Sequence, residues 1–117
     1  MHDNLPKFFY FINEFDKEHI RKLDKKIAII YRNYSEKYDE KKILKIKKFC
    51  KLNRLKFFLA NSVAIVNKLN LDGVYIPSFN RDLSSLKLKN KNIKIIGSAH
   101  NLKEISQKNK QGVELIF

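Results

Sequence analysis

The sequence is poor in the residues that mark several common classes of protein. It has a single cysteine, Cys50, in 117 residues, which excludes an internal disulfide. Cys50 falls on the expected buried face of a helix, where we expect a small buried side chain without a catalytic role. The longest apolar runs, such as Phe8 to Ile12 and Ile27 to Tyr31, are too short to cross a bilayer, and the N-terminus lacks the apolar stretch of a signal peptide. We therefore expect a cytoplasmic protein with no membrane partner.

Acidic residues are scarce as well. Twelve Asp and Glu stand against 25 Lys and Arg, which gives a formal net charge of +13. Such an excess can attract the phosphate backbone of a nucleic acid. The lysines are scattered over the expected helices and loops and are mixed with asparagine and isoleucine, a pattern typical of a coding bias toward A and T. We interpret them as solvated faces, and nucleic acid is the partner that we expect least.

Short apolar runs alternate with segments of helical spacing along the whole chain. The runs begin about every twenty residues, which is the length that a strand and a crossover helix need to reach a parallel neighbour. Asp16 and Asn101 stand where the side chain of a helix N-cap is expected, and Leu102 and Ile105 are expected to face inward in the helix that Asn101 begins. The predicted strands cover residues 7–12, 27–31, 56–60, 73–77, 93–99 and 113–117, and the predicted helices cover residues 16–26, 41–53, 62–69, 83–88 and 101–110.

The pattern predicts an α/β protein with a parallel sheet covered on both faces, because the strands are continuously apolar. An open doubly wound sheet and a closed barrel both fit. Asn13, Glu14 and Phe15 stand where a glycine-rich dinucleotide loop would follow the first strand, which disfavours the open nucleotide-binding fold. We therefore predict a TIM-type (β/α)8 barrel that is incomplete. About six βα units are present, in one partial domain over residues 1–117.

The active site of such a barrel lies at the carboxyl ends of the strands, so the polar residues after each run are the candidates. Arg32 could bind phosphate through its planar guanidinium, or it is an ordinary surface arginine. Ser98 and His100 point to the same side of an extended chain. His100 could transfer a proton near neutral pH, or it merely helps Asn101 to begin the next helix. The full set is Asn13, Glu14, Arg32, Asn33, Asn61, Ser62, Ser78, Asn80, Ser98 and His100.

Three segments in the same order resemble the thiamine-phosphate synthase and TenI family of small TIM barrels. They are Ile29 to Arg32, Leu71 to Ile76, and Ile95 to Glu104, and the last is the most specific. The run from Gly112 to Phe117 looks like the sixth strand of that family. The resemblance implies a transferase that joins hydroxymethylpyrimidine diphosphate to thiazole phosphate and releases pyrophosphate with magnesium, or a tautomerase that acts on the thiazole.

The resemblance also implies roles for five residues. Arg32 matches an arginine that holds pyrophosphate, Ser98 matches a serine near the same phosphates, and His100 matches a histidine proposed as acid or base in the tautomerase branch. Asn61 and Asn80 align with two magnesium-binding aspartates; we group Asn61 with the phosphate-binding residues and Asn80 with the metal position. Mg²⁺ sites usually rest on carboxylates, so the resemblance implies Mg²⁺ while the two amides argue against it.

Two hypotheses therefore lead. The first is a thiamine-phosphate synthase-like enzyme whose partners are small phosphorylated pyrimidine and thiazole substrates. The alternative is a metal-free TenI-like tautomerase or a non-catalytic ligand-binding homologue. A nucleic-acid-binding role ranks third, and it predicts affinity that falls steeply with salt.

The expected sheet has open edges, which natural proteins usually protect. We therefore predict that the 117-residue chain, expressed alone, aggregates or forms a homo-oligomer through these edges. Size-exclusion chromatography with light scattering checks this expectation. A monodisperse monomer that melts cooperatively would contradict it.

Overall fold

In the computed structural model, which describes residues 5–34, 37–88, 90 and 92–117, six strands form one parallel sheet in chain order. Each strand pairs in parallel with the next one along the chain, so the described part of the sheet contains no antiparallel pair. The strands are β1 (Phe8–Ile12), β2 (Ile27–Tyr31), β3 (Lys56–Ala60), β4 (Gly73–Ile76), β5 (Lys94–Gly97) and β6 (Leu115–Ile116).

Helices connect most of the strands, and side chains of the predicted type begin them. The Asp16 carboxylate accepts hydrogen bonds from the amides of Glu18 and His19, and the Asn101 side chain accepts one from the amide of Glu104. Among the described residues, no helix is both long enough and apolar enough to span a membrane. The helices are α1 (Lys17–Arg21), α2 (Glu40–Leu52), α3 (Val63–Leu69), the 3₁₀ helix η2 (Ser84–Lys87) and α4 (Leu102–Lys110).

Several elements are shorter than the sequence predicts, among them β5, which covers Lys94–Gly97 rather than residues 93–99. Helix α1 ends at Arg21 rather than near Lys26, because the amides of the next residues bond in tighter turns. Strand β6 has two residues rather than five. The amide of Val113 donates to the carbonyl of Lys108 and thereby closes α4, so the ladder with β5 begins later.

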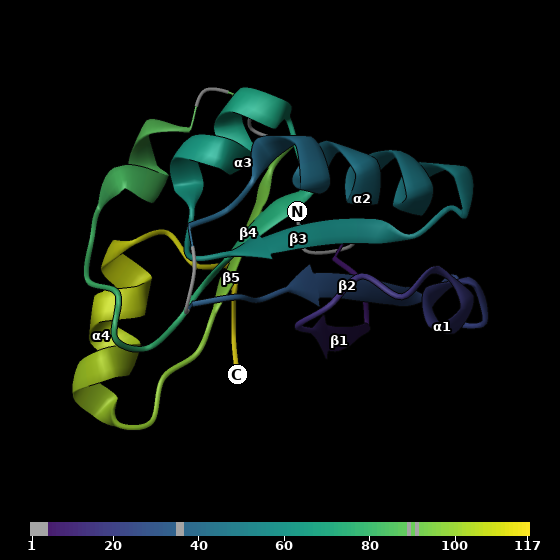
Figure 1. Cartoon of the computed structure of the whole chain (residues 1–117). Helices are drawn as coiled ribbons and strands as arrows, with labels where there is room; N and C mark the ends of the chain where they lie inside the picture. The colour runs from purple at the N-terminus through teal and green to yellow at the C-terminus, as the bar shows by residue number, and fades with distance from the viewer. Residues whose placement is uncertain (1–4, 35–36, 89, 91) are drawn as a thin grey trace.

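The sheet buries apolar side chains on both faces. On the outer face, residues such as Ile29, Phe57 and Val74 pack against the buried Ile43 and Ile46 of α2. Figure 1 shows α2 and α3 on the same side of the sheet. The inner face has its own core, built from Ala28, Ile30, Phe58, Ala60, Tyr75 and Ile96. Burial of both faces is the arrangement that continuous apolar strands predict.

The sheet is strongly curled, and contacts between aromatic rings establish this. The ring of Phe9 in β1 lies 5.3 Å from that of Phe117, which directly follows β6. In a flat sheet the first and sixth strands would be separated by five spacings of about 4.8 Å, roughly 24 Å in all. Phe9 also meets Phe58, and Tyr75 stacks on Phe117. The six strands therefore form a curled half-barrel, consistent with the incomplete TIM-type barrel expected from the sequence.

Gly73 is required where β4 meets its neighbours on the inner face. A Cβ atom added there would overlap the ring of Phe58 and lie 2.7 Å from the carbonyl oxygen of Lys94. We predict that Gly73→Ala lowers the free energy of unfolding by about 1–3 kcal/mol, the usual cost of overpacking. Urea denaturation measures it. Adding Phe58→Leu to Gly73→Ala should offset part of the loss, and an unchanged midpoint for Gly73→Ala alone would contradict this packing.

Candidate functional site

The carboxyl ends of the strands meet at one end of the half-barrel, here called the mouth. Three adjoining pockets of about 440, 390 and 460 Å³ line it. The first two share Asn33 and Tyr34, and the second and third share Asn61 and Ser62, so together they form one groove across the ends of β1 to β4. This groove is the place that the barrel interpretation predicts for a ligand.

Arg32 lies at the β1–β2 side of this groove. It directly follows β2, and its amide donates to the carbonyl of Ile12, which fixes the backbone at the strand end. The guanidinium lies over the ring of Phe11, with its central carbon 4.5 Å from the ring centroid. The guanidinium donors lie in its plane, so stacking one face on a ring leaves the N–H edge available for an anion. Arg32 is half-buried, so its charge is only partly screened by water.

Ser98 lies on the inner side of the mouth, where it is bonded to Tyr75. The buried Tyr75 hydroxyl and Ser98 Oγ are 2.8 Å apart, and the amide of Ser98 donates to the carbonyl of Ile76. With Tyr75 donating, Ser98 keeps its own hydroxyl proton for a ligand oxygen. Ser98 is half-buried and can therefore still reach a ligand in the mouth.

Asn61 and Asn80 are in direct contact. Asn80 Nδ2 donates to Asn61 Oδ1 at 2.6 Å, and both residues line the 460 Å³ pocket. Asn61 has a left-handed backbone (φ 64°), which asparagine tolerates better than most residues. Asn80 Oδ1 accepts from the amide of Asp82, so the loop after β4 is held against the end of β3. Sequence alone placed both amides at the mouth but did not predict that they bond to each other.

This pair does not fit a magnesium ion. The Asn61 oxygen accepts from one amide and the Asn80 oxygen from another, so both potential ligand atoms already have partners. The adjacent acid, Asp82, accepts a hydrogen bond from the amide of Ser84, the first residue of η2. In the described part of the chain, no three His, Cys, Asp or Glu side chains gather in a way that could hold a metal.

His100 lies at the start of α4 rather than in the groove. Its side chain is 76% exposed, and Nδ1 lies 3.4 Å from the carboxylate of Glu104. The amide of His100 donates to the same carboxylate at 2.7 Å, so the residue helps to cap the helix. The structure brings Arg32, Asn61 and Asn80 to the groove and leaves Ser98 and His100 outside the three pockets that form it. A catalytic role for His100 stays a prediction.

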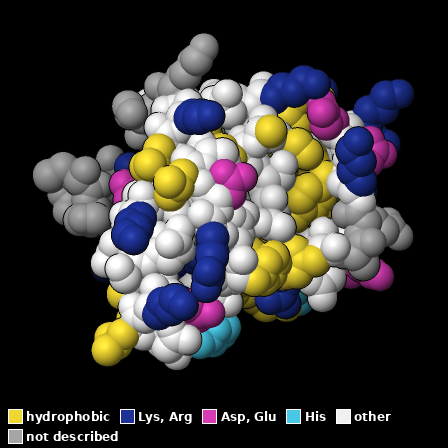
Figure 2. Space-filling view, turned by 90° about the vertical axis from the view of Figure 1, so that its left-hand side faces the viewer, with side chains coloured by type: hydrophobic (Ala, Val, Ile, Leu, Met, Phe, Trp, Pro, Cys, Tyr) yellow, Lys and Arg dark blue, Asp and Glu magenta, His cyan; other side chains and the backbone are white. Residues whose placement is uncertain are grey.

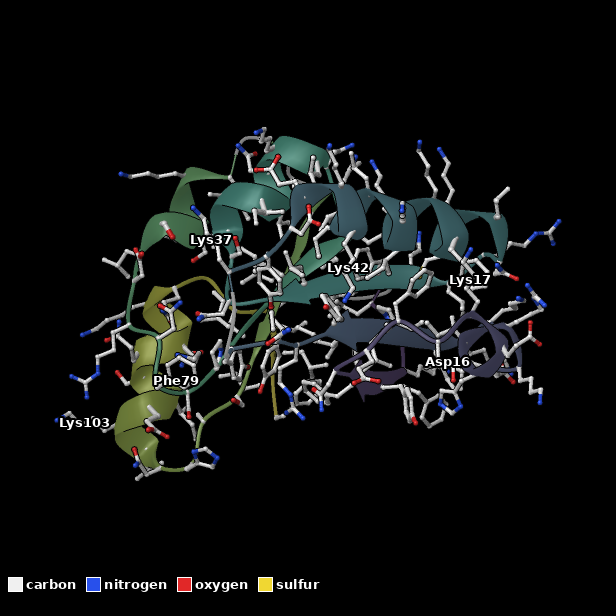
Figure 3. The ribbon with its side chains drawn as sticks, viewed as in Figure 1. Asp16, Lys17, Lys37, Lys42, Phe79 and Lys103 are labelled. Atoms are coloured by element: carbon white, nitrogen blue, oxygen red, sulfur yellow. The ribbon has the colours of Figure 1, made fainter. Side chains whose placement is uncertain are left out.

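An aromatic pair at the mouth was not among the sequence candidates. Tyr34 follows β2, Phe79 follows β4, and their rings meet edge to face at 5.3 Å although both side chains are exposed. Burial raises the pKa of the Tyr34 hydroxyl to about 12, so it is neutral at physiological pH. Figure 3 places Phe79 and Lys37 at the same end of the strands. The pair offers ring faces beside Arg32, and only the pairing of distant loops reveals it.

The inward face of α4 differs from the sequence prediction. Leu102 and Ile105 were expected to face inward, but they are 84% and 38% exposed. Lys108 and Gln111 are fully buried instead. The Lys108 ammonium donates to the carbonyl of Asn80 and to Gln111 Oε1, and Gln111 Nε2 donates to the carbonyls of Asn80 and Asp82. The helix thus buries donors because the loop after β4 presents carbonyls that need partners.

Burial lowers the pKa of Lys108, and the nearby carboxylate of Glu104 opposes that change. Lys108 and Gln111 bond to the backbone carbonyl of Asn80, while Asn61 bonds to its side chain. No local pattern marks a lysine on a polar helix as buried, so sequence analysis missed this network.

We predict that Lys108→Met lowers the free energy of unfolding by about 1–3 kcal/mol, because it removes the donor to the buried Gln111 oxygen and one donor to Asn80. Lys103→Met is the matched control, since Lys103 lies on the same helix and extends away from the ribbon in Figure 3. Urea denaturation of both variants measures the difference. Equal stability of the two would show that the buried bonds contribute nothing.

Comparison with known proteins finds similarity in structure but none in sequence. No protein-family model matches the chain, and no curated protein matches its sequence. Among solved structures, the thiamine phosphate pyrophosphorylase from Pyrococcus furiosus is similar, with a TM-score of 0.62 and 17% sequence identity. The match covers 93% of this chain and 58% of that protein, so the chain spans little more than half of its structural neighbour. At this identity the likeness shows the fold alone.

Proposed function

We propose that the protein binds a phosphorylated heterocycle at the mouth and is a thiamine-phosphate synthase-like transferase. The observation that carries the proposal is Arg32, whose guanidinium lies over the Phe11 ring at the groove and has no ion-pair partner among the described residues. The fold of the Pyrococcus furiosus protein supports the same reading. The ligand class would be the phosphorylated pyrimidine and thiazole that the sequence resemblance implies.

In the proposed reaction, the bond between the pyrimidine methylene and its diphosphate breaks, and the electron pair leaves with pyrophosphate. The thiazole nitrogen then forms a bond to the methylene carbon. Arg32 would neutralise charge on the departing pyrophosphate, and the Ser98 hydroxyl would donate a hydrogen bond to a phosphate oxygen. The exposed rings of Tyr34 and Phe79 would contact a heterocycle beside these groups.

The proposal includes no metal-dependent step. Asn61 and Asn80 use their oxygens in hydrogen bonds of the protein, so the residues present do not suit Mg²⁺. Stabilisation of the leaving group would then rest on Arg32 and on neutral donors, which supply less charge than a divalent cation.

The amide pair also favours a second candidate, a metal-free ligand-binding homologue that does not catalyse the transfer. The exposed His100, paired with Glu104, is less suited to a tautomerase than to the start of a helix. A binding protein would retain affinity for the phosphorylated heterocycle and give no product.

We predict that Arg32→Gln weakens the binding of inorganic pyrophosphate and of thiazole phosphate by at least about tenfold, because a hydrogen bond to a charged group is lost. Arg32→Lys should retain part of the affinity, since it keeps the charge but not the planar pair of donors. Arg81→Gln is the control, because Arg81 is exposed and lies outside the groove-lining residues. Isothermal titration calorimetry measures all four proteins.

Product formation is then measured with EDTA and with added Mg²⁺. Turnover that is unchanged by EDTA supports the metal-free transferase, and affinity without turnover supports the binding protein. Wild-type affinity in Arg32→Gln would contradict both candidates, because each relies on this residue as the anion ligand.

A further inference from the structure

The opposite end of the half-barrel, here called the base, carries a second groove. It lies where α2 ends and β3 begins, at the right-hand end of the molecule in Figure 1. Two pockets of about 420 and 300 Å³ adjoin there and share Lys56 and Asp72. The first is lined by Lys47, Lys51, Arg54, Leu55, Lys56, Asn70 and Asp72, and the second by Pro6, Lys56, Phe58, Asp72, Asn92 and Lys94.

The two ends differ in charge balance. The pockets at the mouth contain the cations of Arg32, Lys37 and Lys87, and each pocket also contains an acid: Glu14, Glu40 or Asp82. Figure 2 shows positive and negative side chains interspersed on the mouth face. The pockets at the base combine five cations with one acid, Asp72. The base is therefore the more strongly positive of the two grooves.

The single acid at the base can balance only one of these five cations. The Asp72 carboxylate accepts a hydrogen bond from the amide of Phe57 at 2.9 Å, which commits one oxygen to the backbone. The three ion pairs among the described residues join Arg21 to Glu18, Lys68 to Glu40 and His100 to Glu104, and none includes a cation of the base. Like charges that converge without counter-ions repel one another, and a bound polyanion would relieve that repulsion.

The backbone holds these cations in place. Lys47 and Lys51 are four residues apart on α2 and so share one face, and the ammonium of Lys47 donates to the carbonyl of Leu69. Arg54 has a left-handed backbone (φ 58°) in the turn that leads to β3. The negative end of the α2 dipole accounts for a cation such as Lys51. It does not account for Lys56 and Lys94, which begin two strands of the sheet.

The 300 Å³ pocket differs from its neighbour because part of its lining is apolar. Lys56 and Lys94 stand two residues before Phe58 and Ile96 of the inner core, so they belong to the inward-facing positions of β3 and β5. Between them the pocket is lined by Pro6 and Phe58, which are apolar, and by Asn92, whose amide can pair with a ring nitrogen or carbonyl. A cationic pocket next to one that is partly apolar suits a ligand with phosphates at one end and a planar ring at the other.

We propose that the base groove binds a nucleoside triphosphate, with its phosphates on Lys51, Arg54 and Lys56 and its base between Pro6 and Asn92. This site is separate from the mouth and does not depend on the function proposed there. It gives part of the excess of lysine a role at one place in the fold.

The test is a titration with ATP in EDTA, followed by backbone amide shifts in two-dimensional NMR of the intact chain. We expect the largest shifts at Arg54, Lys56 and Asn92. The double variant Lys51→Gln/Arg54→Asn removes two charges, and asparagine suits the left-handed backbone at position 54. It should weaken ATP binding by at least about tenfold. Lys41→Gln/Lys45→Gln is the control, because it removes the same charge from exposed positions of α2 outside both pockets.

Inorganic triphosphate carries only the phosphate part of the ligand, and adenosine carries only the base and the sugar. The two compounds therefore test the two parts of the site separately. ATP should bind at least about fivefold more tightly than triphosphate, the factor expected from the contacts of one base. Equal affinity of the two anions, or equal weakening by the two double variants, would overturn the proposal in favour of general attraction to a basic surface. The proposal would also be overturned if the NMR shifts were confined to the mouth. It would be overturned as well if an oligonucleotide bound more tightly than ATP, with an affinity that rises with its length.

Discussion

A parallel sheet has two faces to bury, and the way this chain buries both determines its other features. Helices cover the outer face, where Ile43 and Ile46 of α2 meet alternate residues of the strands. The inner face is buried by curling, so that aromatic rings from distant strands meet one another, Phe9 against Phe117 above all. Because the strands are parallel, curling also gathers all carboxyl ends at one mouth and all amino ends at one base. Both proposed sites follow from that geometry.

The elements of the fold could be predicted from sequence because their signals are local. Each strand contains a short apolar run, and Asp16 and Asn101 cap helices in the way that short polar side chains do. Contacts between segments were harder to predict. The exposed Leu102 and the buried Lys108 reverse the ordinary rule of burial, because the loop after β4 offers carbonyls to α4. Such an exchange depends on tertiary partners that no single segment reveals.

In the candidate site, too, the sequence predicts where residues lie but not which residues they contact. The positions of Arg32, Asn61, Ser98 and Asn80 at strand ends follow from the barrel interpretation. The contacts that these residues make do not follow from it, because each contact joins residues from different βα units. They are the Asn61–Asn80 bond, the Tyr75–Ser98 bond and the position of Arg32 over Phe11. These contacts decide the chemistry, since they occupy the amide oxygens of Asn61 and Asn80 and hold the Arg32 guanidinium over a ring at the groove. Charge separates the two ends further, with balanced pockets at the mouth and an excess of cations at the base.

The most direct test of this account is the distance between the first and last strands. Nuclear Overhauser effects between the ring protons of Phe9 and Phe117 report contacts of this length, and the curled sheet predicts clear cross-peaks because the ring centroids are 5.3 Å apart. An open sheet would place these strands roughly 24 Å apart. Phe9 would then show contacts to adjacent strands and none to Phe117, and that result would contradict the half-barrel together with the mouth and base that depend on it.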